Sequence, residues 1–219
     1  MTDIIVSYDG TSNDDDAVAL AKMLAWGGAS LALAYVRHSK EFDPRREELA
    51  AHDANRRLEA GAALLGAPDT PRHVVVSAST REGLEQLAAA EGASLIVFGS
   101  DYRTPPGHAE PGNTAQHLLE GGRVAIAVAV AGLRALTDET IESISVSSPG
   151  DTAAGDTATA LAGNLGAEIV SSDDGPADLI VVGSVGPAGR IALTGVTRSQ
   201  LSSARASVLV VPSGNPVSF

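Results

Sequence analysis

The chain contains two nearly identical stretches, ASLIVFGSDY at residues 93–102 and ADLIVVGSVG at residues 177–186. In each, a small residue precedes a continuous apolar run that ends at Gly-Ser. A run of this kind is typical of a parallel strand that is buried on both faces of its sheet. The repetition predicts that one strand-and-helix unit is written twice.

The spacing of the matched positions differs along the chain. Gly10 in IIVSYDG matches Gly150 in ISVSSPG, 140 positions later, whereas Gly99 matches Gly183, only 84 positions later. The second copy therefore lacks roughly the segment 37–92, which in the first copy reads as helix, strand and helix. We predict a complete domain of five alternating strands and helices at 1–133, and a truncated copy without the third strand and its flanking helices at 141–219.

Strands that alternate with helices pair in parallel through right-handed crossovers. We therefore expect an α/β fold with doubly wound parallel sheets and helices on both faces. In such sheets ligands bind beyond the carboxyl ends of the strands. Three loops of the first copy converge there: YDGTSND, the residues after Val36, and GSDYRTPPGHAEPGN.

Composition excludes several classes of protein. The hydrophobic content of 44% can build a packed core, and the net charge of −12 argues against nucleic acid and anionic membranes as partners. The absence of cysteine removes disulfides and thiolate zinc sites, and fits a reducing compartment. The start MTDIIVSYDG has no basic region, and no apolar run reaches spanning length. We expect a cytoplasmic protein.

The stretches IIVSYDGT, LIVFGS and LIVVGS, with the helix and strand that close each copy, resemble the universal stress proteins in their tandem form. The resemblance covers nearly the whole chain. It implies a Rossmann-like fold of the adenine-nucleotide α-hydrolase type and a regulatory role in the stress response. It also implies that VAIAVAV and SVLVVPS pair antiparallel across a pseudo-twofold axis, which would hide two apolar strand edges. A homodimer, docked where the second copy lacks its third strand, is an expectation by the same analogy.

Members of that family that bind ATP carry a motif of Gly, two residues, Gly, nine residues, Gly and then Ser or Thr, with an Asp after strand one. Gly99 and Gly112 fit this spacing, Asp9 stands at the Asp position, and Val36 is placed near the base. With Asn113, these residues form the expected site. The resemblance implies ATP, ADP or AMP as the ligand, with or without Mg²⁺.

Both copies depart from the motif. Tyr102 replaces its second glycine and Asn113 its final Ser or Thr. The second copy keeps Gly183 and Gly186, but its loop is shorter, it has Thr194 followed by Gly195 where the motif should close, and Pro149 replaces the Asp. These departures leave open the alternative that the chain holds no ligand at all.

The residues also have a physical interpretation. Gly99 and Gly112 allow positive φ and a close approach of a phosphate, or they serve only tight turns. Asn113 or Thr114 is expected to cap the next helix, whose free amides would favour an anion, with Arg103 nearby. Asp9 either accepts hydrogen bonds from a ribose or an adenine amine, or caps a turn. Tyr102 either fills the phosphate space or stacks along its edge.

Other polar residues indicate no separate site. Residues 14–16, DDD, fall in the first turn of a predicted helix capped by Ser12 or Asn13, where acids complement the helix dipole. The histidines show no metal spacing, so no metal site is expected. His108 and His117 lie near the proposed loop, where either could contact a ligand or face solvent.

Catalytic patterns are missing from the sequence. It has no Gly-x-Ser-x-Gly elbow and no Walker lysine, and its two lysines lie outside glycine loops. Three hypotheses remain, in descending order: a nucleotide-binding regulatory module that is not an enzyme, a degenerate scaffold that acts through protein contacts, and a weak enzyme of adenylate chemistry.

Overall fold

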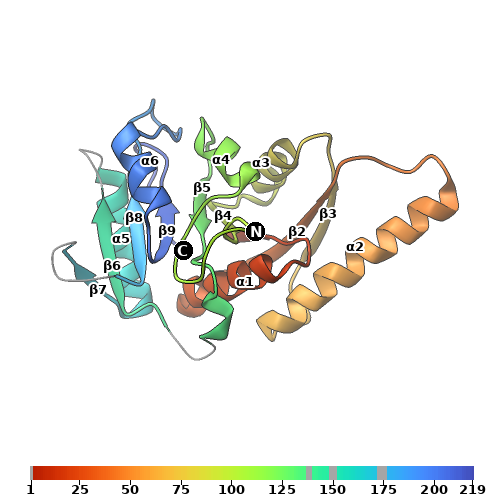
Figure 1. The fold of residues 1–219 in the computed structure, drawn as a ribbon, viewed down its shortest axis with the longest axis horizontal. Helices are drawn as coiled ribbons and strands as arrows, with labels where there is room; N and C mark the ends of the chain where they lie inside the picture. The colour runs from red at the N-terminus through yellow and green to blue at the C-terminus, as the bar shows by residue number, and fades with distance from the viewer. Residues whose placement is uncertain (1, 137–139, 148–151, 172–176) are drawn as a thin grey trace.

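Strands and helices alternate along the chain in the computed structural model, which describes residues 2–136, 140–147, 152–171 and 177–219 (Figure 1). The first part contains β1 (Ile4–Ser7), α1 (Ser12–Leu24), η1 (Ala25–Gly27), β2 (Leu31–Arg37), α2 (Pro44–Leu65), β3 (Arg72–Val76), α3 (Thr80–Glu91), β4 (Leu95–Phe98), α4 (Asn113–Leu119), β5 (Ala125–Val128) and η2 (Leu133–Ala135). The second part contains β6 (Ser143–Ser147), α5 (Thr152–Leu165), β7 (Glu168–Val170), β8 (Leu179–Val182), α6 (Gly195–Ser202) and β9 (Ser207–Val210).

All strands join one nine-stranded sheet in the order β3-β2-β1-β4-β5-β9-β8-β6-β7. The two repeated stretches are β4 and β8, each inside its own half of the sheet. Seven of the eight neighbouring pairs are parallel. The expected doubly wound α/β fold is confirmed. The division into copies at 1–133 and 141–219 stays a prediction.

Helices cover both faces of the sheet. One core joins α1, α2 and α5 to the sheet and includes Ile4 and Val6 of β1. The other joins α3, α4 and α6 to the opposite face and includes Ile5. Successive residues of β1 therefore serve opposite cores, which is why the strand is apolar throughout. Among the described residues, no helix is long and apolar enough to cross a membrane.

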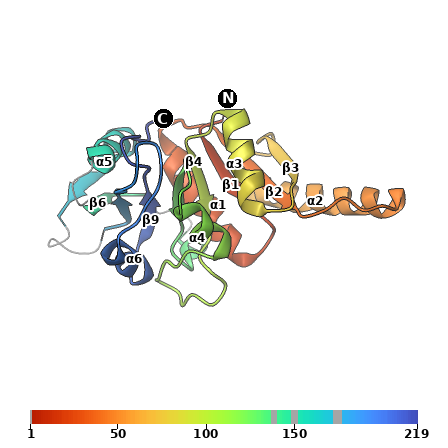
Figure 2. The same cartoon turned by 90° about the horizontal axis from the view of Figure 1, so that it is seen from above.

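The two halves meet at β5 and β9. These strands pair antiparallel with Ile126 opposite Val210 and Val128 opposite Val208, so the expected pairing of the last strands is confirmed. All residues of both strands are buried. In Figures 1 and 2, β9 lies between the first half and the rest of the second half. The pairing removes two edges that would otherwise expose unpaired backbone groups.

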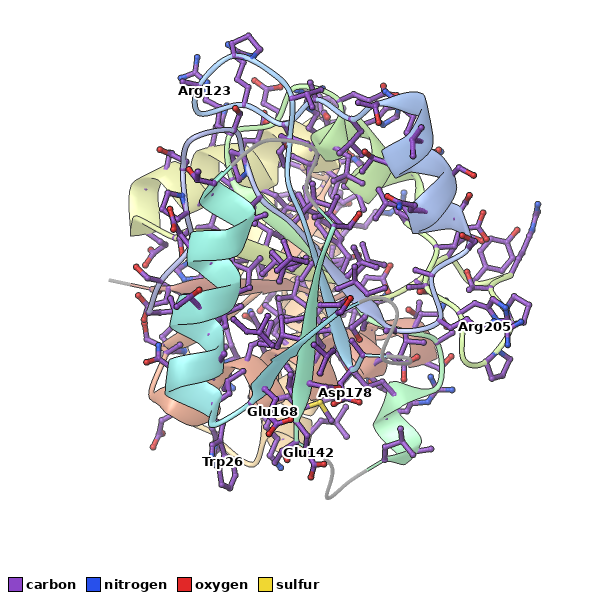
Figure 3. The ribbon with its side chains drawn as sticks, turned by 90° about the vertical axis from the view of Figure 1, so that its left-hand side faces the viewer. Trp26, Arg123, Glu142, Glu168, Asp178 and Arg205 are labelled. Carbon is purple, nitrogen blue, oxygen red and sulfur yellow. The ribbon has the colours of Figure 1, made fainter. Side chains whose placement is uncertain are left out.

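The outer end of the second half is built differently. β6 reads SISVS, with Ile144 in the core beneath α5 and serines on the other side of the strand. This alternation is typical of a strand with one apolar face. The edge strand β7 has three residues, and Figure 3 shows Glu142, Glu168 and Asp178 together at one end of this region. Charges of one sign beside a short edge strand discourage edge-to-edge pairing.

The repeated Gly-Ser has a structural cause in both halves. Ser100 Oγ donates to the Ala129 carbonyl at 2.7 Å, and Ser184 Oγ donates to the Val211 carbonyl at 2.7 Å. Both serines are buried, and each acceptor directly follows the last strand of its half. The hydroxyl satisfies a buried carbonyl where the strand ladder ends.

Gly99 lets the start of α1 approach the end of β4. A Cβ on Gly99 would lie 2.0 Å from the Asn13 carbonyl oxygen, while Asn13 Nδ2 donates to the Ser100 carbonyl at 2.9 Å. Neither Gly99 nor Gly112 has positive φ, so that expectation was wrong. Gly99 is needed for close packing, whereas a Cβ on Gly112 would meet only the Asp101 Cα, at 4.0 Å.

Asp16 ties the end of the first half to α1. Its side chain is 1% exposed and accepts hydrogen bonds from Gly132 N at 2.9 Å, Arg134 N at 2.8 Å and Arg134 Nη1 at 2.8 Å. The chain leaves β5 through this turn on its way to the second half. Asp16 therefore does more than complement the dipole of α1.

We expect Asp16→Ala to lower the free energy of unfolding by about 3 kcal/mol, because it leaves two backbone N–H groups without an acceptor. Urea unfolding followed by circular dichroism measures the change. Asp156→Ala is the matched control, because Asp156 is an exposed acid inside α5. Equal losses in the two variants would contradict the structural role of Asp16.

The two motif glycines should also differ in stability tests. We expect Gly99→Ala to cost about 2 kcal/mol or more, because the new methyl overlaps the Asn13 carbonyl and the start of α1 must shift. Gly112→Ala should change the free energy of unfolding by less than about 0.5 kcal/mol, since the space is open and its φ is −68°. The same urea titration compares both variants. A Gly99→Ala protein as stable as Gly112→Ala would overturn the packing argument.

Candidate functional site

A pocket of about 350 Å³ lies beyond the carboxyl ends of β1, β2 and β4. It brings together all five residues that the sequence predicts for the site: Asp9, Val36, Gly99, Gly112 and Asn113. They come from four separate segments, which parallel pairing of the strands brings to one edge of the sheet. The other lining residues are Ser7, Tyr8, Asp14, Ala34, Tyr35, His38, Thr80, Phe98, Thr114 and Ala115.

A compact hydrogen-bonded turn shapes the acidic side of the pocket. Asp9 Oδ1 accepts from Thr11 N at 3.1 Å, so Asp9 caps a turn while it also lines the pocket. Asp14 Oδ2 accepts from Asp9 N at 3.0 Å, Thr11 N at 3.1 Å and Thr11 Oγ1 at 2.9 Å. The N-cap of α1 is therefore Thr11, not Ser12 or Asn13 as predicted. Asp14 holds Thr11 outside the helix and so sets where α1 begins.

Asp14 is an unusual acid because it lies next to a second carboxylate. Burial, and then the hydrogen bond with Asp9 and its charge, raise the pKa of Asp14 to about 7. The backbone hydrogen bonds from Asp9 N and Thr11 N lower the pKa of Asp14 and only partly offset this effect. The pocket therefore carries less negative charge below pH 7 than above it.

Part of the pocket lining is apolar and aromatic. Val36 and Phe98 are buried near the ends of β2 and β4, and Tyr35 precedes Val36 on β2. The Arg57 guanidinium lies 5.5 Å from the Tyr35 ring centroid and donates to the Asp9 carbonyl at 2.8 Å. A lining that combines acceptors with apolar side chains suits a flat ligand that has polar edges.

The end of the loop before α4 and the first turn of α4 form another part of the pocket lining. Gly112 is the N-cap of α4 with φ −68°, and Asn113 is the first helical residue, so the prediction of Asn113 or Thr114 as the cap was wrong. The Ser100–Pro111 bridge and the bond from Gln116 Nε2 to the Pro111 carbonyl, at 2.9 Å, fix the chain just before the helix. Because the chain is held at Pro111, the cap of α4 is Gly112, directly before Asn113.

Three residues near this loop lie away from the pocket lining. Tyr102 is 72% exposed and neither fills nor borders the described cavity; the Arg103 guanidinium lies 4.8 Å from its ring centroid. His108 and His117 are also absent from the lining. The replacement of the second motif glycine by Tyr102 therefore leaves the pocket open.

Three lining residues, Asp14, His38 and Thr80, are not among the predicted site residues. Asp14 was predicted only to complement the helix dipole, although it lies five residues after Asp9 and a short turn can join the two. Thr80 begins α3, just beyond the carboxyl end of β3. Because β3 pairs with β2 in parallel, its following loop reaches the same edge of the sheet. The three loops that were predicted to converge at this edge did not include the loop after β3.

In the second half, Gly186 serves local packing. A Cβ on Gly186 would lie 2.9 Å from the Ala192 Cβ, and Val185 N donates to the Ala192 carbonyl at 3.0 Å. Thr194 caps α6 and accepts from Thr197 N at 3.1 Å. Pro149, at the Asp position, lies outside the described residues. Among the described residues, no group of three or more His, Asp or Glu could hold a metal ion.

A larger groove of about 480 Å³ lies elsewhere, along α1 and the end of α2. Its described lining includes Met23, Trp26 and Leu64 but none of the five predicted site residues. Size alone would favour this groove. We take the smaller pocket as the candidate site because it lies where parallel sheets bind ligands and contains every predicted residue.

Comparison with known proteins identifies the family. The model of the Universal stress protein family matches residues 1–130. A universal stress protein from Archaeoglobus fulgidus DSM 4304 shares the fold with a TM-score of 0.60 at 14% identity, covering 96% of this chain and 98% of that one. A protein from Pseudomonas aeruginosa UCBPP-PA14, described as a universal stress protein, has a TM-score of 0.60 at 15% identity, covering 96% and 93%.

A universal stress protein in complex with cAMP matches 44% of this chain and 71% of its own at 26% identity, with a TM-score of 0.34. No curated protein sequence matches the chain. The family model nevertheless spans more than half of the 219 residues, and the fold is shared over nearly all of them. The chain therefore belongs to the universal stress protein family.

Proposed function

We propose that the chain is a regulatory module of the stress response that binds an adenine nucleotide or nucleoside in the pocket of its first half. One observation carries the proposal: five residues predicted from sequence, on four separate segments, line a single pocket at the ligand-binding edge of the sheet. The role is regulatory because the sequence offers no nucleophile-and-base pattern around that pocket.

The chemistry of the lining supports this ligand class. Asp9 can accept hydrogen bonds from ribose hydroxyls or an adenine amine. Val36 and Phe98 offer an apolar surface for a base. The openness at Gly112 adds independent support, because the fold itself has no need of a glycine there. Backbone without a Cβ allows a ligand to approach closely.

A scaffold that binds no ligand is the second candidate. The specific observation in its favour is that Tyr102 and Asn113 replace two motif positions. Under this alternative the first-half pocket is a remnant, and the function depends on protein contacts. A ligand titration separates the two candidates directly.

We expect adenine compounds to raise the melting temperature, because a ligand that binds only the folded state stabilises it. At a ligand concentration near 100 times Kd the shift should be about 5–10 °C for a chain of this size. The measurement is a thermal-shift titration with adenosine, AMP, ADP and ATP, each with and without Mg²⁺. Asp9→Ala and Gly112→Val should abolish the shift.

Gly195→Val is the control, because Gly195 lies at the start of α6 in the second half, directly after the N-cap Thr194, and has open space around it. It should keep the full shift. If no adenine compound shifts the wild-type protein, and none is released when the purified protein is denatured, the nucleotide proposal fails and the scaffold alternative stands.

A further inference from the structure

The charges around the pocket indicate which adenine compound it suits. Among its described lining residues are two carboxylates, Asp9 and Asp14, and one imidazole, His38, but no Lys or Arg. Phosphate groups in proteins are held chiefly by cationic side chains and by free backbone N–H groups. A ligand with several phosphates would therefore find no cationic Lys or Arg side chain in the described lining.

Two cations beside lining residues already have partners within the protein. Arg57 donates Nε to Asp53 at 2.9 Å and Nη1 to the Asp9 carbonyl at 2.8 Å. Arg37, directly after Val36, is buried and forms a two-pronged ion pair with Glu47 at 3.0 and 2.8 Å.

Arg81, directly after the lining residue Thr80, pairs with Glu85 at 3.6 Å. Two further cations lie in exposed loops. Arg103 lies against the exposed Tyr102 ring in the loop before α4. Lys40, in the loop after β2, lies outside the pocket lining. Neither side chain lines the pocket, so neither offsets Asp9 and Asp14 there.

The donors at Asp9 and Thr11 are also used within the protein. Asp9 N and Thr11 N, in the loop after β1, both donate to Asp14. Thr11 Oγ1 donates to the same carboxylate oxygen. These three donors are therefore already paired with a carboxylate of the protein.

We propose that this pocket takes adenosine, or an adenosine phosphate with a single negative charge, in preference to ATP. The inference rests on the proposed function, since it narrows the ligand of the same site. Ribose hydroxyls and the adenine amine are donors that match Asp9 and Asp14. Each further phosphate adds negative charge beside these two acids, in a chain whose net charge is −12.

Isothermal titration calorimetry with adenosine, cAMP, AMP, ADP and ATP, each with and without Mg²⁺ at pH 8, tests the order of affinities. We expect adenosine to bind at least about tenfold more tightly than ATP. ATP that binds as tightly as adenosine, with or without Mg²⁺, would overturn the inference and leave the proposed function standing. Failure of all five compounds to bind would overturn both.

The variant Asp14→Asn removes one of the two charges at nearly constant shape. It should narrow the ratio of adenosine to ATP affinity by about threefold or more. Glu168→Gln is the matched control, because it makes the same change in net charge at the exposed β7 edge, in the other half of the sheet (Figure 3). A ratio that changes equally in both variants would show a general charge effect and contradict a role for the pocket acid.

The pH dependence of cAMP binding gives a second readout, because the cAMP phosphodiester keeps one charge at all pH values used, whereas terminal phosphates titrate near pH 6. The groups around Asp14 are Asp9, Asp15, Tyr8, His38 and Arg57. Asp14, with its pKa near 7, loses its proton as the pH rises, so cAMP should bind about threefold more weakly at pH 8 than at pH 6.

The Asp14→Asn variant tests the assignment directly, because it removes the group whose titration is proposed to weaken cAMP binding. The variant should bind cAMP with nearly the same affinity at pH 6 and at pH 8. A wild-type affinity for cAMP that stays constant from pH 6 to pH 8, or a variant with the full wild-type dependence, would contradict the assignment to Asp14.

Discussion

The antiparallel pairing of β5 with β9 is the interaction on which the rest of the structure depends. It turns two parallel sheets into one, and it puts α1, α2 and α5 on one face and α3, α4 and α6 on the other. Because both strands are buried in the middle of the sheet, neither half offers a free edge at its last strand. Asp16 reinforces this junction by holding the turn that leaves β5 against α1. The start of α1 is thereby fixed relative to both halves.

The start of α1 serves the fold and the pocket together. Asn13 packs on Gly99 and bonds to the Ser100 carbonyl, which seats the helix on the end of β4. The next residue, Asp14, sets the N-terminus of the helix through Thr11 and lines the pocket beside Asp9. The position that gives the helix a good cap therefore also brings a second carboxylate into the site. A raised pKa for Asp14 is the physical consequence of this double role.

The fold class could be predicted from the sequence because the apolar strand patterns are local and occur in both halves. Continuous apolar runs at β4 and β8 predicted buried parallel strands, and the apolar last strands, with the family resemblance, predicted their pairing. The five predicted site residues lie together because strand ends converge in parallel sheets. The cap at Thr11 agrees with the local Thr-x-x-Asp pattern of residues 11–14, which favours Thr11 over Ser12 or Asn13. The cap at Gly112 could not be predicted in the same way, because it depends on the bridge between Ser100 and Pro111, which the local pattern does not contain.

The two motif glycines show why a matched motif is not by itself an argument for a ligand. Gly99 is required by the packing of α1, so any chain with this fold and this helix position would keep a glycine there whether or not it bound a nucleotide. Gly112 has no such requirement, since its φ is ordinary and its surroundings are open. Only Gly112 therefore carries information about a ligand. The identity of such a ligand must be argued from charge. The described lining of the pocket contains the two carboxylates of Asp9 and Asp14 but no Lys or Arg. The motif thus predicts where a ligand would bind, and in our proposal the electrostatics of Asp9 and Asp14 govern which ligand it would be.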